Sequence, residues 1–193
     1  MKIKMLLFLI LSVLFIFLIN LSNEDKEIYY VNIDTTNQMK YNDKIVNEIK
    51  KEHKLEKYIN YFSKKDYRTT DLIKDIESNK KINNQTIQNA LIKSDILTLY
   101  VGINDINYKI ANTNKEELYK YTDQVLEDIE ILLKMIRDYS KEKIYVIGYD
   151  NNIGISYNDY FNYTNKRLKS ICEEYKINFV KNNNILNKID LLN

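Results

Sequence analysis

The pattern of apolar and polar positions predicts strands that alternate with helices. Apolar runs of strand length occupy residues 28–33, 58–62, 96–101, 144–147 and 177–180. Apolar residues at three- or four-residue spacing predict helices over 41–52, over 72–76 behind Thr69 or Thr70 as a cap, and over 87–92, 118–136 and 160–175. The run at 96–101 is apolar almost throughout, which is typical of a central parallel strand covered on both faces.

This order of elements predicts the fold class. Strands separated by helices form βαβ units, which build an α/β fold with a parallel sheet between two helical layers and right-handed crossovers. A chain of 193 residues is long enough for one such domain and a short appendage. We therefore predict a three-layer α/β domain over residues 28–193.

Residues 1–23 have the features of a membrane anchor. Lys2 and Lys4 precede an apolar run over 5–19, and acidic residues follow at 24 and 25. As a helix, the segment 5–22 would be about 27 Å long, close to the thickness of a thin bilayer. With the lysines inside, it would be a single-pass transmembrane helix of the cell membrane, with the domain facing outside. The alternative is a cleaved signal peptide and a secreted protein, although no A-x-A-like pair precedes Asn23.

Charge balance and the scarcity of certain residues exclude several classes of function. With 29 basic and 27 acidic side chains the formal charge is +2, which argues against nucleic acid as a partner. A single His53 and a single Cys172 exclude a two-His metal site, an internal disulfide and a zinc finger, and three Gly residues cannot form a Gly-rich phosphate loop. We therefore expect no metal and no cofactor, and we expect Cys172 to lie in the core.

Ligands of parallel α/β sheets bind beyond the carboxyl ends of the strands, so the residues that follow each strand are the candidate site. Asp34-Thr35-Thr36 follows the first predicted strand, residues 64–72 follow the second, and Gly102-Ile103-Asn104-Asp105 follows the central one. This order resembles the SGNH (GDSL) esterase and lipase family, whose third conserved block is G-x-N-D after a central strand. The resemblance extends over residues 28–180 and implies a flavodoxin-like SGNH hydrolase fold.

The resemblance also implies a chemistry. In this family a Ser after the first strand attacks an ester carbonyl, and backbone N–H groups together with the Asn side-chain amide hold the oxyanion. A His in a C-terminal D-x-x-H block, oriented by the Asp, takes the Ser proton. Of these groups, Gly102 and Asn104 are retained here.

The other positions of the family pattern have changed. Thr36 stands at the nucleophile position, with Asp34 where the family has Gly; a one-residue shift would make Thr35 the nucleophile instead. Asp66 stands at the position of the Gly that donates an oxyanion N–H. No D-x-x-H block occurs between Lys181 and Asn193, and His53 precedes the second strand.

These departures lead to three hypotheses. The first is a pseudoenzyme: a membrane-anchored SGNH-like domain outside the cell that lacks hydrolase activity and binds a cell-surface glycan, acyl or peptide ligand, or a protein partner, through the remaining cleft. The alternative is an active esterase or lipase on acyl esters, with Thr36 or Thr35 as nucleophile and an unrecognised base. The third is a C-terminally truncated gene product of reduced stability.

Three polar features remain open between structural and functional interpretations. Arg68-Thr69-Thr70-Asp71 fits a ligand contact and a helix N-terminus equally well. Asp105 fits a helix cap as well as a site residue. Asn79-Lys80-Lys81 predicts a solvated turn.

Overall fold

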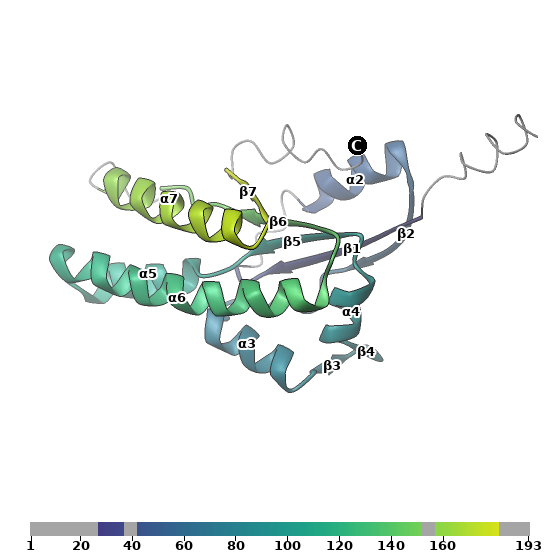
Figure 1. The fold of residues 1–193 in the computed structure, drawn as a ribbon, viewed down its shortest axis with the longest axis horizontal. Helices are drawn as coiled ribbons and strands as arrows, with labels where there is room; N and C mark the ends of the chain where they lie inside the picture. Colours follow the sequence, from purple (N-terminus) through teal and green to yellow (C-terminus); the bar gives the residue numbers. More distant parts are fainter. Residues whose placement is uncertain (1–26, 37–41, 152–156, 182–193) are drawn as a thin grey trace, which may run out of the picture.

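The computed structural model describes residues 27–36, 42–151 and 157–181, and Figure 1 shows its ribbon. The anchor predicted over residues 1–23 lies outside these ranges. Among the described residues, no helix has both the length and the apolar composition needed to cross a bilayer.

The described chain forms a parallel sheet of 5 strands in the order β2-β1-β5-β6-β7. The strands are β1 (Glu27–Asp34), β2 (Lys54–Ile59), β5 (Ile96–Tyr100), β6 (Lys143–Ile147) and β7 (Asn178–Val180). Every residue of β5, the central strand, is buried. The predicted α/β class with a parallel sheet is therefore confirmed.

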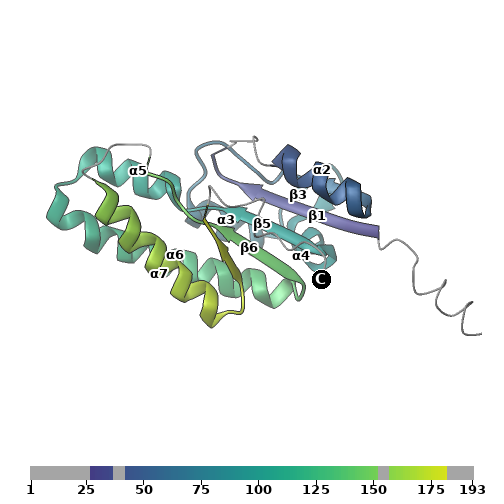
Figure 2. The same ribbon diagram turned by 90° about the horizontal axis from the view of Figure 1, so that it is seen from above.

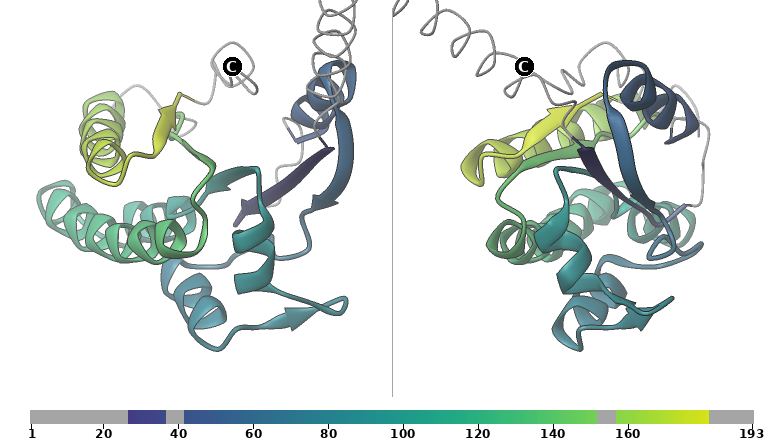
Figure 3. Two further views of the ribbon diagram at one scale, coloured as in Figure 1. Left: turned by 45° about the vertical axis from the view of Figure 1, so that its right-hand side comes forward. Right: turned by 90° about the vertical axis from the view of Figure 1, so that its right-hand side faces the viewer.

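Helices connect the strands and cover the sheet. They are α2 (Asn42–Glu52), α3 (Thr69–Glu77), α4 (Ile87–Lys93), α5 (Ile103–Asn112), α6 (Lys115–Tyr139) and α7 (Asn158–Glu174). Figure 3 shows α2 on one side of the sheet and the layer with α3, α4 and α6 on the other. Seen from above in Figure 2, α6 and α7 run side by side, and α6 also packs against α3, α4 and α5.

The core includes buried side chains from the strands and from α2, α3, α4, α6 and α7, and a large part of it lies between the sheet and α6. Residues Val31 and Leu97 are register partners in β1 and β5, as are Ile33 and Leu99, and all four are fully buried. From α6 come buried residues at helical spacing: Leu118, Val125, Leu126, Ile129, Leu132, Leu133 and Ile136. Burying one such aliphatic side chain contributes roughly 1.5–3 kcal/mol, so this layer supplies much of the stability. Cys172 is also buried, as predicted.

The structure corrects one local prediction and contains elements that were not predicted. The second strand covers Lys54–Ile59 rather than 58–62, because it is an edge strand with charged exposed positions, and Tyr61 and Phe62 follow it in a turn. A short hairpin of β3 (Lys81–Ile82) and β4 (Gln85–Thr86) was not predicted; Asn83 and Asn84 between them have φ of 50° and 62°, as a tight hairpin turn requires. Helix α5 was also not predicted.

Candidate functional site

The threonines at the end of β1 have their hydroxyl groups bonded within the site. The backbone N–H and the hydroxyl of Thr35 both lie within hydrogen-bond distance of the Tyr100 carbonyl, at 3.0 and 3.2 Å. The backbone N–H and the hydroxyl of Thr36 both donate to Asp34 Oδ1, at 2.7 Å each. Asp34 thereby fixes Thr36 in a turn of the kind that Asp side chains favour.

Asn104 brings the three sequence blocks together. Its Nδ2 atom donates to the carbonyl oxygens of Thr35 and Tyr67, at 2.8 Å in both cases. A side-chain amide has two N–H donors, so both are used by backbone carbonyls. The blocks after β1, β2 and β5 therefore meet at the carboxyl edge of the sheet, as the sequence predicts.

Gly102 is the N-cap of α5 and adopts a conformation that a side chain would not tolerate. Its φ of 84° lies in the left-handed region, and an added Cβ would lie 2.5 Å from Ile129 Cδ1 and 2.6 Å from Tyr149 Oη. The Tyr149 hydroxyl donates to the Val101 carbonyl at 2.7 Å and holds the end of the central strand against β6 and its following residues. Glycine is therefore required here for both backbone and packing reasons.

Asp66 occupies the position that the resemblance assigns to glycine, and its backbone retains a glycine-like conformation. Its φ is 65°, in the left-handed region, and its side chain is exposed. The following residue, Tyr67, supplies one of the carbonyls that accept from Asn104. The loop thus keeps a glycine-like shape beside the candidate oxyanion donor while adding a carboxylate.

Asp105 acts as a cap, but for a neighbouring helix. Its Oδ2 atom accepts hydrogen bonds from the Thr69 backbone N–H at 3.0 Å and from the Thr69 hydroxyl at 3.1 Å. Thr69 is the first residue of α3, and the preceding Arg68 is the N-cap, with its N–H donating to Asp71 Oδ2 at 3.1 Å. The prediction that Thr69 or Thr70 caps this helix is therefore wrong, and Arg68-Thr69-Thr70-Asp71 forms a helix N-terminus.

A buried chain of hydroxyl and amide groups lies beneath the end of β1. Ser63 Oγ accepts from the Asp34 backbone N–H at 2.8 Å and donates to the Asn32 carbonyl at 3.2 Å. Asn32 Oδ1 accepts from Thr98 Oγ1, which also bonds the Tyr30 hydroxyl, at 2.7 Å each. These residues were not predicted as part of the site; the signal in the sequence was the presence of polar positions inside otherwise apolar strands.

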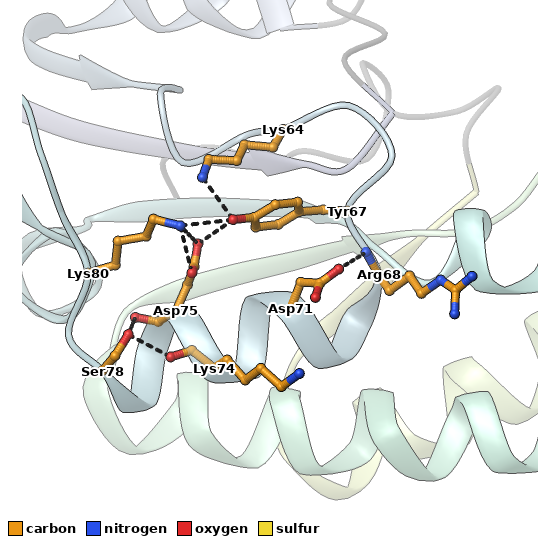
Figure 4. Close-up of polar contacts among 8 residues, drawn as sticks. All are labelled: Lys64, Tyr67, Arg68, Asp71, Lys74, Asp75, Ser78 and Lys80. Atoms are coloured by element: carbon orange, nitrogen blue, oxygen red, sulfur yellow. Dashed lines mark hydrogen bonds and ion pairs between the residues drawn. The ribbon is translucent and has the colours of Figure 1, made fainter.

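A charged cluster fixes the loop that carries Asp66 (Figure 4). The Tyr67 hydroxyl accepts from Lys64 Nζ at 2.8 Å and Lys80 Nζ at 2.9 Å, and it donates to Asp75 Oδ2 at 3.0 Å. Lys80 also forms an ion pair with Asp75 at 2.8 Å. Hydrogen bonding to Asp75 raises the pKa of the Lys80 ammonium above its ordinary value. The prediction of a solvated turn at residues 79–81 is thus wrong for Lys80.

Comparison with known proteins gives the fold its context. No family model matches the sequence, and no curated protein does. Solved structures that match include a lipase from a goat rumen metagenome, with TM-score 0.60, 15% identity and 80% of each chain covered. An acetylxylan esterase from Geobacillus stearothermophilus matches with TM-score 0.57 and 17% identity over 81% of this chain and 76% of that one. An acetyl xylan esterase matches with TM-score 0.57 and 12% identity over 83% and 81%.

The chain has an SGNH/GDSL esterase-like fold. Within this fold His53 lies far from the threonines, because it immediately precedes β2, where Lys54 pairs with Glu27 at the start of β1. Thr36 follows the other end of β1, about 23 Å away at ~3.3 Å per residue. The only imidazole in the sequence is therefore not a proton acceptor for Thr36. In the part of the chain that the structure describes, no group of His, Cys, Asp and Glu side chains is arranged to hold a metal ion.

Proposed function

We propose that this chain is a non-catalytic SGNH-fold domain that binds a ligand or a partner. The observation that carries the proposal is the use of both Asn104 amide protons by the carbonyls of Thr35 and Tyr67. An oxyanion hole needs donors that point at the place where negative charge develops. Here both N–H groups of the Asn104 amide, to which the family resemblance assigns that task, donate to backbone carbonyls instead.

The state of the candidate nucleophiles supports the same proposal. The hydroxyl groups of Thr35 and Thr36 donate to Tyr100 and Asp34, and the only histidine of the sequence lies at the opposite end of β1. A hydroxyl is a weak nucleophile unless a positioned base removes its proton. The Asp66 carboxylate would in addition oppose an oxyanion formed beside the loop.

One observation favours an active esterase as a second candidate. Asp34 Oδ1 lies 2.7 Å from the Thr36 hydroxyl, within the distance at which a carboxylate could accept its proton. In that case Thr36 would attack an acyl ester and Asp34 would serve as base. Asp34→Asn would then abolish turnover without removing the turn geometry.

An esterase assay separates the two candidates. The purified chain would be incubated with p-nitrophenyl acetate and with a fluorophosphonate probe, beside a known serine esterase as positive control. The proposal expects no probe labelling and hydrolysis at the buffer rate. It is wrong if turnover exceeds that rate and disappears in Thr36→Ala, Thr35→Ala or Asp34→Asn, while Thr113→Ala at the end of α5 retains it.

We also propose that residues 1–23 tether the domain to the outer face of the cell membrane, where it would meet glycan, acyl or peptide ligands. The support is the sequence pattern of two lysines, an apolar run and acidic residues. Fractionation of cells that produce the full chain should recover it in the membrane pellet at full mass. A shortened form in the medium would instead indicate cleavage and secretion.

A further inference from the structure

A cavity of about 430 Å³ lies at the carboxyl ends of β6 and β7, beside the first half of α7. This volume falls within the range of about 300–1,000 Å³ that is usual for small-molecule sites. Its lining includes Tyr149, Asn165, Lys166, Lys169, Phe179 and Lys181. Its position, at the carboxyl edge of the sheet, is where ligands of parallel α/β folds bind.

Helix α7 gives the cavity a polar stripe. Asn158, Asn162, Lys166 and Lys169 follow one another at spacings of four, four and three residues, which places them on one face of the helix. The buried residues Tyr160, Thr164 and Ile171 lie on the opposite side of α7. The helix therefore uses one face for the core and presents amides and ammonium groups to the cavity with the other.

The charge of the lining is positive. Lys166, Lys169 and Lys181 stand against a single carboxylate, Asp150. Lys169 lies 3.4 Å from Glu173 in an exposed pair, and exposed pairs of this kind contribute little energy. Lys166 and Lys181 are exposed and form no ion pair with another described residue. An anionic group entering the cavity would thus meet ammonium groups that can pair with it.

The floor of the cavity is rigid and partly aromatic. Asn165 Oδ1 accepts from the Tyr149 N–H and Asn165 Nδ2 donates to the Tyr149 carbonyl, each at 2.8 Å. A Cβ at Gly148 would lie 2.6 Å from the Phe179 ring, so the absence of a side chain there lets this half-buried ring pack on the backbone. A fixed floor lowers the cost of ordering a site when a ligand binds.

We propose that this cavity binds a negatively charged saccharide of one or two rings. Lysines would pair with its carboxylate or phosphate, and Asn158 and Asn162 offer side-chain amides that both donate to and accept from hydroxyl groups. Phe179 provides an apolar surface for the C–H face of a sugar ring. The Asp150 carboxylate accepts a hydroxyl proton and disfavours a second negative charge on the ligand. This inference deepens the proposed binding function and rests on it.

Binding is measured by isothermal titration on the full chain, purified in a detergent without a sugar headgroup. The probes are glucuronate and glucose 6-phosphate as charged sugars. Xylose serves as a sugar without a charge, and inorganic phosphate serves as an anion without a sugar. Lys166→Gln with Lys181→Gln should weaken binding of the charged sugars at least tenfold. The matched control is Lys120→Gln with Lys134→Gln, which changes exposed lysines of α6 outside the cavity lining and should leave the affinity unchanged.

Each outcome decides the inference. A charged sugar that binds more tightly than xylose and inorganic phosphate, with the loss confined to the Lys166 and Lys181 variant, supports it. Equal binding of xylose would overturn the anionic part, and equal binding of inorganic phosphate would overturn the saccharide part. No binding of either charged sugar at millimolar concentration overturns the inference as a whole. The esterase assay above has its own readout, so failure of the proposed function is recognised separately.

Discussion

Asn104 contributes to stability because it satisfies two carbonyl groups from different segments. Asn104→Ala removes both hydrogen bonds and leaves the Thr35 and Tyr67 carbonyls without this donor. Leaving partly buried polar groups unpaired costs roughly 1–3 kcal/mol, so we expect the free energy of unfolding to fall by about that amount. Urea denaturation followed by circular dichroism measures the change.

The matched control lies in the same helix. Asn112 is exposed, and among the described residues its amide donates to the Tyr108 carbonyl of α5 alone, at 2.7 Å. Asn112→Ala should therefore change the free energy of unfolding by no more than about 0.5 kcal/mol. Equal effects of the two substitutions would contradict the role that we assign to Asn104.

Position 102 requires glycine for two reasons, its backbone conformation and its packing. In Gly102→Ala the new Cβ would lie 2.5 Å from the buried Ile129 side chain, at a φ of 84°. Left-handed backbone costs a non-glycine residue roughly 1–2 kcal/mol, and overpacking adds about 1–3 kcal/mol. Gly148→Ala meets only the packing term, against the half-buried Phe179 ring at 2.6 Å and Asn165 Oδ1 at 2.9 Å. Thermal unfolding should show a larger loss at Gly102 than at Gly148; the reverse order would refute the argument.

The retained motif was the part of the site that sequence could predict. A G-x-N-D block after an apolar strand predicts a position at the carboxyl end of that strand, and Gly102 and Asn104 lie at the carboxyl end of β5. The partners of these residues were not predictable, because they come from loops. Thr35 lies 69 positions and Tyr67 lies 37 positions before Asn104, and no local pattern connects them to it.

At the scale of elements, the cluster around Tyr67 fixes the loop after β2 to α3. Asp75 is the carboxylate of this cluster: it pairs with Lys80 and accepts from the Tyr67 hydroxyl, to which the ammonium groups of Lys64 and Lys80 both donate. Asp75→Asn leaves these two positive charges facing each other, so we expect a loss of roughly 1–3 kcal/mol in the free energy of unfolding. Because salt screens the repulsion, the loss should shrink as sodium chloride rises in urea titrations.

An exposed ion pair serves as the comparison for this element. Glu48 pairs with Lys51 at 2.6 Å on the surface of α2. Such pairs contribute about 0–1 kcal/mol, so Glu48→Gln should be close to neutral at any salt concentration. If Asp75→Asn is equally neutral, the cluster does not hold the loop.

The sequence pattern predicted the buried elements correctly and the exposed elements incorrectly. The central strand and the long helix α6 carry strong apolar patterns, and both lie where predicted. The position predicted for β2 was wrong because the side chains of Lys54, Glu56 and Lys57 are charged and exposed at the sheet edge. The strand was predicted instead at the aromatic residues that follow it. Edge strands carry charges that prevent pairing with other chains. Because of those charges, an edge strand lacks the apolar pattern by which strands are predicted.

At the scale of the whole molecule, buried groups that must stay protonated predict a loss of stability at alkaline pH. Burial raises the pKa of the Cys172 thiol from 9.0 to about 12, and it raises the pKa of the Tyr149 hydroxyl well above its ordinary value of 10.0. Above pH 9 the unfolded chain releases the thiol proton while the folded chain keeps it. The folded state is therefore progressively disfavoured as pH rises toward 12.

Between pH 9 and 10 the thiol titrates together with the tyrosines of the unfolded chain, several of which also have a raised pKa in the fold. The contribution of the thiol is therefore measured as the difference between the unaltered chain and Cys172→Ala. Urea midpoints at pH 7.5, 9.0, 9.5 and 10.0, at constant ionic strength, should fall with a limiting slope of about 1.4 kcal/mol per pH unit from this group. Cys172→Ala will be less stable at pH 7.5 because it opens a cavity, so the slope rather than the absolute stability is compared. The slope between pH 9 and 10 should flatten in the variant, since no thiol remains to titrate. An unchanged slope would mean that Cys172 is not the group whose protonation the fold maintains.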